Sequence, residues 1–275
     1  MEDPIIPTDF GTWFSKVFAA LGRSWKSLAL VHLLIVIPQM LLGVLFAWRL
    51  PTVAVTNDPN RLFQNLGATV GGGLLLGIVS FVFQAVASVA SAHILSHDAA
   101  GVATGAPRTD WMVALRFGWT KLGRMIGWSI LSSLLTLVGF VLCILPGVWI
   151  GAIFYATLSG VVAFERGDVI SRCMALVKGR WWPTFGRLLI LWLMASAAGA
   201  VSGAIGVGSR LGFGGLGGAS FGSVSIVSVL FSQLVAAVIA VPVGMLRSAG
   251  AVVIYAELRS KHEYLNSSIL AAEAR

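Results

Sequence analysis

The side chains that could carry out catalysis or metal binding are few, since the 275 residues include only four histidines and eleven acids. His93 and His97 stand four residues apart, with Asp98 beside them. Two histidines at this spacing share one helix face, as zinc ligands often do. No third ligand is apparent nearby, and both fall where an apolar helix meets the lipid headgroups. A pair of interfacial histidines is the simpler interpretation, so His93 and His97 are only candidate metal ligands, and we expect no cofactor.

The remaining acids form no pair at the spacing of a hydrolytic site, so we assign no catalytic residue and expect a protein that is not an enzyme. The glycine-rich stretch at 206–218 lacks the Gly-Lys-Ser/Thr ending of a phosphate-binding loop and predicts a flexible link. Five acids are interpreted as solvated: Asp3, Asp9, Asp58, Asp110 and Glu263.

Polar residues inside apolar segments are more informative, because buried polarity is costly in a membrane. Arg247 precedes Glu257 by ten residues, about 15 Å along a helix, so the two cannot pair within one helix. Arg247 would reach towards the cytoplasmic face, pair with another helix or face a substrate. The candidates of this kind are His32, Gln84, Gln233 and Arg247.

Basic residues alternate with tryptophans in several short segments, a pattern that also occurs on nucleic-acid-binding surfaces. Here the segments precede apolar stretches, which favours contact with anionic lipid headgroups or with a protein partner, and no nucleic acid. The residues concerned are Arg23, Trp25, Lys26, Trp119, Lys121, Lys178, Arg180, Trp181 and Trp182.

Composition identifies the class of protein that must position these residues. Hydrophobic residues make up 57% of the chain and charged residues 11%, against roughly 25% charged residues in soluble domains. Residues 125–164 and 211–246 carry no charge, and 62–101 carry only Asp98. About 20 apolar residues cross a bilayer as a helix, and the runs lack the alternation of barrel strands. The sequence therefore predicts an all-α polytopic bundle of about six transmembrane helices.

The expected organisation is an N-terminal cytoplasmic segment at 1–27, a transmembrane domain at 28–260 and a cytoplasmic tail at 261–275. An amphipathic helix at 8–21 either lies in the headgroup region or packs on the bundle. A Pro146-Gly147 turn separates the third and fourth spans, and Pro242 bends or breaks the sixth. The predicted spans are 28–48, 67–95, 125–145, 148–164, 184–207 and 223–257, with a further short helix at 109–121.

The distribution of Lys and Arg predicts the orientation. Only Arg49, Arg61 and Arg210 lie in links on one side of these spans, against fifteen basic residues on the other. Cytoplasmic loops are enriched in Lys and Arg, so both termini are expected in the cytoplasm. The segments 20–26, 114–121 and 175–182 share basic and tryptophan residues before outward spans. They indicate either three repeated helical hairpins or convergence on the same interfacial pattern.

Several motifs resemble a family of bacterial membrane proteins named after the glycerophosphoryl diester phosphodiesterase membrane domain. They include Ile5-Ile6-Pro7, Leu145-Pro146-Gly147-Val148-Trp149 and the stretches 162–167, 175–186 and 253–259. The resemblance extends over essentially the whole chain, although Asp is commoner in the family at the position of Glu257. It implies a stand-alone protein of the bacterial plasma membrane, without the phosphodiesterase domain that such regions accompany in fusions.

Three functions remain open from the sequence. The first is a non-enzymatic accessory or scaffold module that recruits a partner, tested by changing Trp181 and Trp182 to Ala. The second is a transporter or lipid-handling protein with a polar path near Arg247, tested by flux in Arg247→Ala. The third is a membrane-embedded enzyme, suggested by the family name and the histidine pair and tested by metal analysis. The oligomeric state is open.

Overall fold

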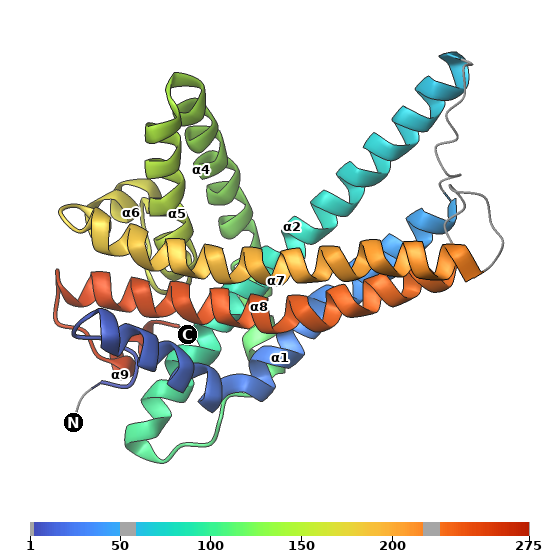
Figure 1. Cartoon of the computed structure of the whole chain (residues 1–275). Coiled ribbons are helices and arrows are strands. Elements are labelled where there is room, and N and C mark those ends of the chain that lie inside the picture. The colour runs from blue at the N-terminus through green and yellow to red at the C-terminus, as the bar shows by residue number, and fades with distance from the viewer. Residues whose placement is uncertain (1–2, 50–58, 217–225, 275) are drawn as a thin grey trace. The chain divides into compact units, whose positions relative to one another are not determined.

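The computed structural model describes residues 3–49, 59–216 and 226–274, and within these ranges it contains helices and no strands (Figure 1). Six helices are long and apolar enough to cross a membrane. The predicted class, a polytopic helical membrane protein, is therefore confirmed. The helices are α1 (Phe10–Arg49), α2 (Pro59–Thr104), α3 (Trp111–Thr120), α4 (Leu122–Leu142), α5 (Ile144–Phe164), α6 (Val169–Val177), α7 (Trp181–Leu216), α8 (Ile226–Ser260) and α9 (Ser267–Glu273).

The chain divides into two compact units. Unit 1 comprises Met1–His32, Gln84–Leu193 and Gly244–Arg275, and unit 2 comprises Leu33–Phe83 and Met194–Val243. Helices α1, α2, α7 and α8 each contribute one portion to each unit, whereas α3 to α6 and α9 belong to unit 1 alone. All Lys and Arg residues except Arg49, Arg61 and Arg210 fall in unit 1. The positively charged residues are thus concentrated in unit 1.

Helix α1 corrects the prediction of a separate amphipathic helix before the first span. It continues unbroken for 40 residues, because the segment at 22–27 contains no proline to interrupt its hydrogen bonds. Its length of about 60 Å is twice the thickness of the hydrocarbon core, so part of it lies outside the core. Both interpretations of residues 8–21 find support. Trp13 and Val17 are buried in unit 1, whereas Phe10, Phe14 and Phe18 form an exposed stripe.

The reversal between α4 and α5 lies at Cys143, not at Pro146-Gly147 as predicted. Cys143 is extended, with φ −171° and ψ 153°. Pro146 lies in the first turn of α5, where a helix does not use the backbone N–H that proline lacks. Gly147 instead allows close contact between the helices, since a Cβ there would lie 2.4 Å from the Phe140 ring.

The remaining boundaries differ from the predictions in three places. Gly179 has φ +77°, a conformation that favours glycine, and α7 therefore begins at Trp181 rather than at residue 184. The predicted glycine-rich link is helical up to Leu216, and its other residues lie outside the described ranges. Helix α8 is continuous through Pro242, and the predicted tail contains α9, which contacts the end of α8 as described below.

The three basic segments that suggested a hairpin repeat do not share one local structure. Residues 20–26 lie within α1 and residues 114–121 run to the junction of α3 with α4, while 175–182 contain the turn at Gly179. Their similarity is one of sequence, which favours convergence on a common interfacial pattern.

Close packing of α3 on α2 gives a first testable prediction. A Cβ on Gly118 would lie 2.7 Å from the Val86 carbonyl oxygen, which is backbone and cannot rotate away. We expect Gly118→Ala to lower the free energy of unfolding by about 1–3 kcal/mol through overpacking. Gly127→Ala on α4 is the matched control, because a Cβ there meets nothing within 4 Å. Equal thermal stability of both variants in detergent would contradict this contact.

Candidate functional site

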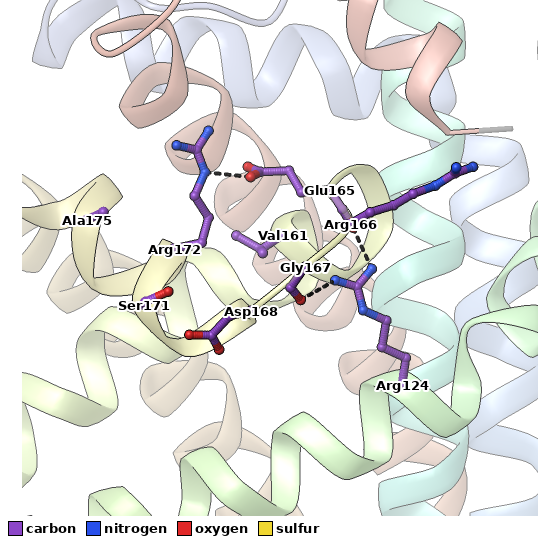
Figure 2. Close-up of a pocket in the computed structure, with 9 residues that line it drawn as sticks. All are labelled: Arg124, Val161, Glu165, Arg166, Gly167, Asp168, Ser171, Arg172 and Ala175. Carbon is purple, nitrogen blue, oxygen red and sulfur yellow. Dashed lines mark hydrogen bonds and ion pairs between the residues drawn. The ribbon is translucent and has the colours of Figure 1, made fainter.

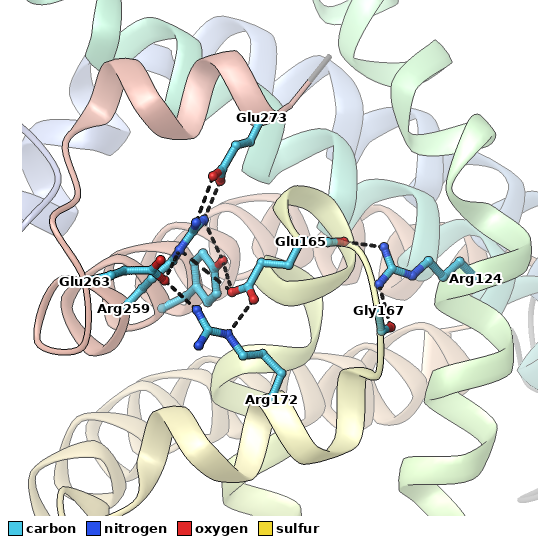
Figure 3. A network of polar contacts seen from close by, with 8 residues as sticks. Arg124, Glu165, Gly167, Arg172, Arg259, Glu263 and Glu273 are labelled. Atoms are coloured by element: carbon cyan, nitrogen blue, oxygen red, sulfur yellow. Dashed lines mark hydrogen bonds and ion pairs between the residues drawn. The ribbon is translucent and has the colours of Figure 1, made fainter.

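Among the described residues, the most extensive polar feature is a network of ion pairs in unit 1 (Figure 3). Its centre is Arg259, buried near the end of α8. The Arg259 Nε atom lies 2.7 Å from Oε1 of Glu263, and its NH2 atom lies 2.8 Å from Oε1 of Glu273 on α9. The NH1 atom makes a second hydrogen bond to the Glu273 carboxylate. This bidentate pair holds the end of α8 against the C-terminal helix.

A second arginine extends the network to α5 and α6. Arg172 donates from Nε to Oε2 of Glu165 and from NH2 to Oε1 of Glu263, both at 2.5 Å. The Tyr255 hydroxyl donates to the other Glu165 oxygen at 2.7 Å. Two arginines thus alternate with three glutamates contributed by the end of α5, the α8–α9 connection and α9. Both oxygens of Glu165 are engaged, which leaves this carboxylate in a structural role.

Local sequence signals place these elements. Asp168 caps α6 by accepting from the Ile170 amide at 3.2 Å, and Asn266 caps α9 by accepting from the Ile269 amide at 2.8 Å. Gly167, with φ +126°, allows the sharp connection between α5 and α6. Arg124 on α4 donates to the carbonyl oxygens of Glu165 and of Gly167 and so holds this connection.

Charge pairing shifts the pKa values of groups in the network. Burial lowers the pKa of Arg172, but hydrogen bonds to Glu165 and Glu263 outweigh it and raise that pKa overall. For Glu263, burial acts to raise the pKa, and the adjacent Arg259 and Arg172 guanidinium groups more than offset it, so the pKa is lowered.

The lowered pKa of Glu263 predicts acid sensitivity. Its usual pKa is 4.5, so its contribution to stability is complete above that value and is lost as pH falls through the lower folded-state pKa. We expect wild type to exceed Glu263→Gln in thermal stability by a constant margin between about pH 5 and pH 7, with the margin closing in more acidic buffer. Thermal unfolding of both proteins across this range measures the effect. A margin that is independent of pH would rule out ionic pairing of Glu263.

A cavity of about 360 Å³ adjoins the network between α4, α5 and α6 (Figure 2). Arg124, Arg166 and Arg172 line it together with Glu165, Asp168 and Ser171. Arg124 and Arg172 already donate to protein oxygens, and the Arg166 side chain is directed away from Arg172. Arg124 and Arg172 are therefore already committed to contacts within the protein.

A separate ion pair joins the start of α7 to the end of α8. Arg187 NH2 lies 2.9 Å from Glu257 Oε1, and the residues are only 4% and 7% exposed. Arg187 Nε and Glu257 Oε2 have no hydrogen-bond partner among the described residues. The sequence did not predict this pair, since Glu257 was weighed only against Arg247 in the same helix and as part of a family motif, and Arg187 only among the basic residues that indicate orientation. A buried pair of this kind is costly to disrupt.

The histidine candidates are in direct contact with each other. The rings of His93 and His97 stack with centroids 4.0 Å apart, and His97 Nδ1 lies 3.0 Å from the His93 carbonyl oxygen. Asp98 Oδ1 accepts from the Thr109 amide at 2.7 Å. Within the described ranges, no three His, Cys, Asp or Glu side chains are grouped so that they could hold a metal ion.

Two of the intramembrane polar candidates, His32 and Arg247, contact other helices of unit 1. His32 Nε2 is buried between the hydroxyls of Ser91 and Ser248, at 3.4 and 3.3 Å. Arg247 donates from Nε to the Tyr155 hydroxyl at 2.6 Å, so it contacts another helix, one of the three alternatives for this residue. Gln84 is exposed.

In unit 2, Gln233 lies against α1 (a Cβ on Gly43 would be 2.6 Å from its Nε2).

The predicted headgroup or partner residues are mostly accessible. Trp25 is 51% exposed and Trp182 75% exposed. Trp119, Lys26, Lys178 and Arg180 are exposed as well, and Arg23 and Lys121 are partly buried. Trp181 stacks on Phe185 with ring centroids 4.8 Å apart.

The acids interpreted as solvated behave differently from one another. Asp9 and Asp110 are exposed caps of helix N-termini, which fits that interpretation. Asp3 and Glu263 are corrections: Asp3 accepts from the Ser267 amide at 2.7 Å, and Glu263 belongs to the ion-pair network. Ser267 is distant from Asp3 in sequence, so no local pattern marks that contact, but Arg259 precedes Glu263 by four residues, a spacing that could have indicated their pairing. Asp58 lies outside the described residues.

Six apolar helices define the class of the chain as a multi-pass membrane protein. Comparison with known proteins finds no matching family model, no matching curated protein and no matching solved structure. The resemblance to the glycerophosphoryl diester phosphodiesterase membrane domain therefore stays a prediction.

Proposed function

We propose that the protein is a non-enzymatic scaffold of a bacterial plasma membrane, which recruits a protein partner at a basic, tryptophan-bearing cytoplasmic surface in contact with anionic lipid. One observation carries the proposal. In unit 1, exposed Trp25, Trp119 and Trp182 lie close in sequence to exposed basic residues, whereas five acids are engaged in hydrogen bonds or ion pairs within the protein, namely Asp98, Glu165, Glu257, Glu263 and Glu273. The accessible charge is thus largely positive, as a surface that meets anionic headgroups requires.

Two features of α1 support contact with a membrane surface. Phe10, Phe14 and Phe18 form an exposed stripe, and Trp25 lies further along the same helix with the Lys26 ammonium 5.8 Å from its ring. Exposed aromatics beside basic residues are characteristic of helices at the membrane interface. The ion-pair network supports the scaffold role, because its carboxylates hold helix ends together instead of facing a substrate.

The proposed orientation can be tested at the native cysteines. Cys143 is exposed at the α4–α5 turn, and Cys173 is buried. Burial raises the pKa of Cys173 to about 11, so its reactive thiolate is scarce at neutral pH. With both termini in the cytoplasm, Cys143 faces outward, and a membrane-impermeant maleimide should label it in intact cells. Cys143→Ser should abolish labelling, and labelling that requires broken cells would reverse the proposed orientation.

Recruitment is tested by quantitative mass spectrometry of the protein purified gently from its own membranes. We expect a stoichiometric partner with wild type and its loss with Trp25→Ala/Trp182→Ala. Trp192→Ala is the matched control, since Trp192 is 63% exposed but lies in the apolar part of α7. The same partner recovered with all three proteins, or no partner with wild type, would contradict the scaffold role.

A transporter or lipid-handling role is the second candidate, and one observation favours it. His32 and the pair of Arg247 with Tyr155 place polar groups within four apolar helices, α1, α2, α5 and α8. Such groups often line a pathway through a membrane. Loss of transport in Arg247→Ala, with unchanged thermal stability, would favour a transporter over the scaffold role.

A further inference from the structure

An apolar cavity of about 370 Å³ lies between α5, α6 and the start of α7. Trp149 and Ile153 line it from α5, Met174 and Val177 from α6, and Trp181 from α7. Its polar boundary is the turn at 178–180, which reverses the chain at Gly179. A volume of this size accommodates part of a small amphiphile.

The Trp181 side chain packs against two neighbouring rings and carries an N–H donor without an acceptor among the described residues. The Trp181 indole is stacked on Phe185 and lies edge-on to Trp182, with ring centroids 4.8 and 4.7 Å away. Its Nε1 atom is buried and has no hydrogen-bond acceptor within the described part of the chain. Buried indole N–H groups usually find an acceptor, so the missing partner points to a ligand oxygen.

The charge beside the cavity is positive. Lys178 lines it, and Arg180 lies on the same turn; both are exposed. Neither forms an ion pair in the described ranges, whereas Arg172, Arg187 and Arg259 are all paired with glutamates. A ligand with a phosphate group would complement the two unpaired cations.

An apolar path continues from the cavity along α5. Leu145 stands one turn before Trp149, on the same helix face, and is 77% exposed. A soluble anion would not use this surface, but the acyl chain of a lipid would cover it. We propose that the cavity binds one anionic glycerophospholipid, with its phosphate at Lys178, Arg180 and the Trp181 N–H and an acyl chain against Trp149 and Leu145. This site deepens the proposed function and rests on its contact with anionic lipid.

Native mass spectrometry of the protein released from bilayer nanodiscs tests the site. The probe is phosphatidylglycerol mixed with phosphatidylcholine, and we expect wild type to retain one phosphatidylglycerol. Lys178→Gln/Arg180→Gln should weaken retention by about tenfold or more, because two charge-assisted contacts are lost. Trp181→Phe keeps the aromatic wall, removes the N–H and should weaken retention severalfold. Arg108→Gln/Arg116→Gln removes the same charge from exposed positions elsewhere and should change nothing.

The outcomes separate this site from the scaffold role. Equal retention of the two lipids, equal loss in the control double variant, or full retention in both site variants would overturn the site. Displacement by inorganic phosphate alone would indicate a plain anion site and overturn the lipid assignment. Partner recruitment that persists without lipid retention would support the scaffold role and contradict the lipid site. Lipid retention without any partner would support the lipid site and contradict the scaffold role.

Discussion

Arg259→Met should lower the free energy of unfolding by about 3 kcal/mol, because it removes the central partner of a network of carboxylates. Arg259 is buried and contacts Glu263, Glu273 and the Tyr255 hydroxyl. Glu263 and Glu273 are 39% and 31% exposed and regain some hydration when the arginine is lost, which places the effect at the lower end of the range for buried pairs. Chemical unfolding in detergent, followed by tryptophan fluorescence, measures the change.

The matched control is Arg116→Met, which removes an exposed arginine from α3 in the same unit. We expect it to stay within about 0.5 kcal/mol of wild type. Limited proteolysis gives a local measure, since release of α9 from Arg259 should expose the C-terminal residues to cleavage. Wild-type stability and proteolysis in Arg259→Met would mean that the network does not hold α9.

Arg187→Met should be still more damaging, with an expected loss of about 3–5 kcal/mol, because it leaves the buried Glu257 carboxylate without its cation. Arg187 on α7 contacts Glu257 on α8 through the 2.9 Å ion pair. The second carboxylate oxygen of Glu257 has no hydrogen-bond partner in the described part of the chain. The measurement is the same unfolding experiment in detergent.

The double variant Arg187→Met/Glu257→Met distinguishes a paired charge from a residue needed for its shape. Replacement of both partners by apolar side chains removes the uncompensated charge, so we expect most of the lost stability to return. A double variant that is as unstable as the sum of the single changes would show that the two residues act independently.

The sequence was most informative about the elements and least informative about the contacts between them. The short helix predicted at 109–121 agrees with α3, which begins after its cap at Asp110, since apolar periodicity is a local property. The candidate site was predictable only in part. Trp25 and Trp182 are exposed as a contact surface requires, but Glu263 was interpreted as a solvated acid and is an ion-pair partner.

By itself, the sequence determined that this chain is a helical multi-pass membrane protein with six apolar spans. That property depends only on the length and hydrophobicity of each segment, which each segment carries alone. The tertiary structure decided where helices continue, as α1 does through residue 22, and which charges meet. Arg172 and Glu263 are 91 residues apart in sequence, and Glu165 and Tyr255 are 90 apart. Their pairing arises only when α5, α6 and α8 pack together, because ion pairs depend on distance in space and on the exclusion of water.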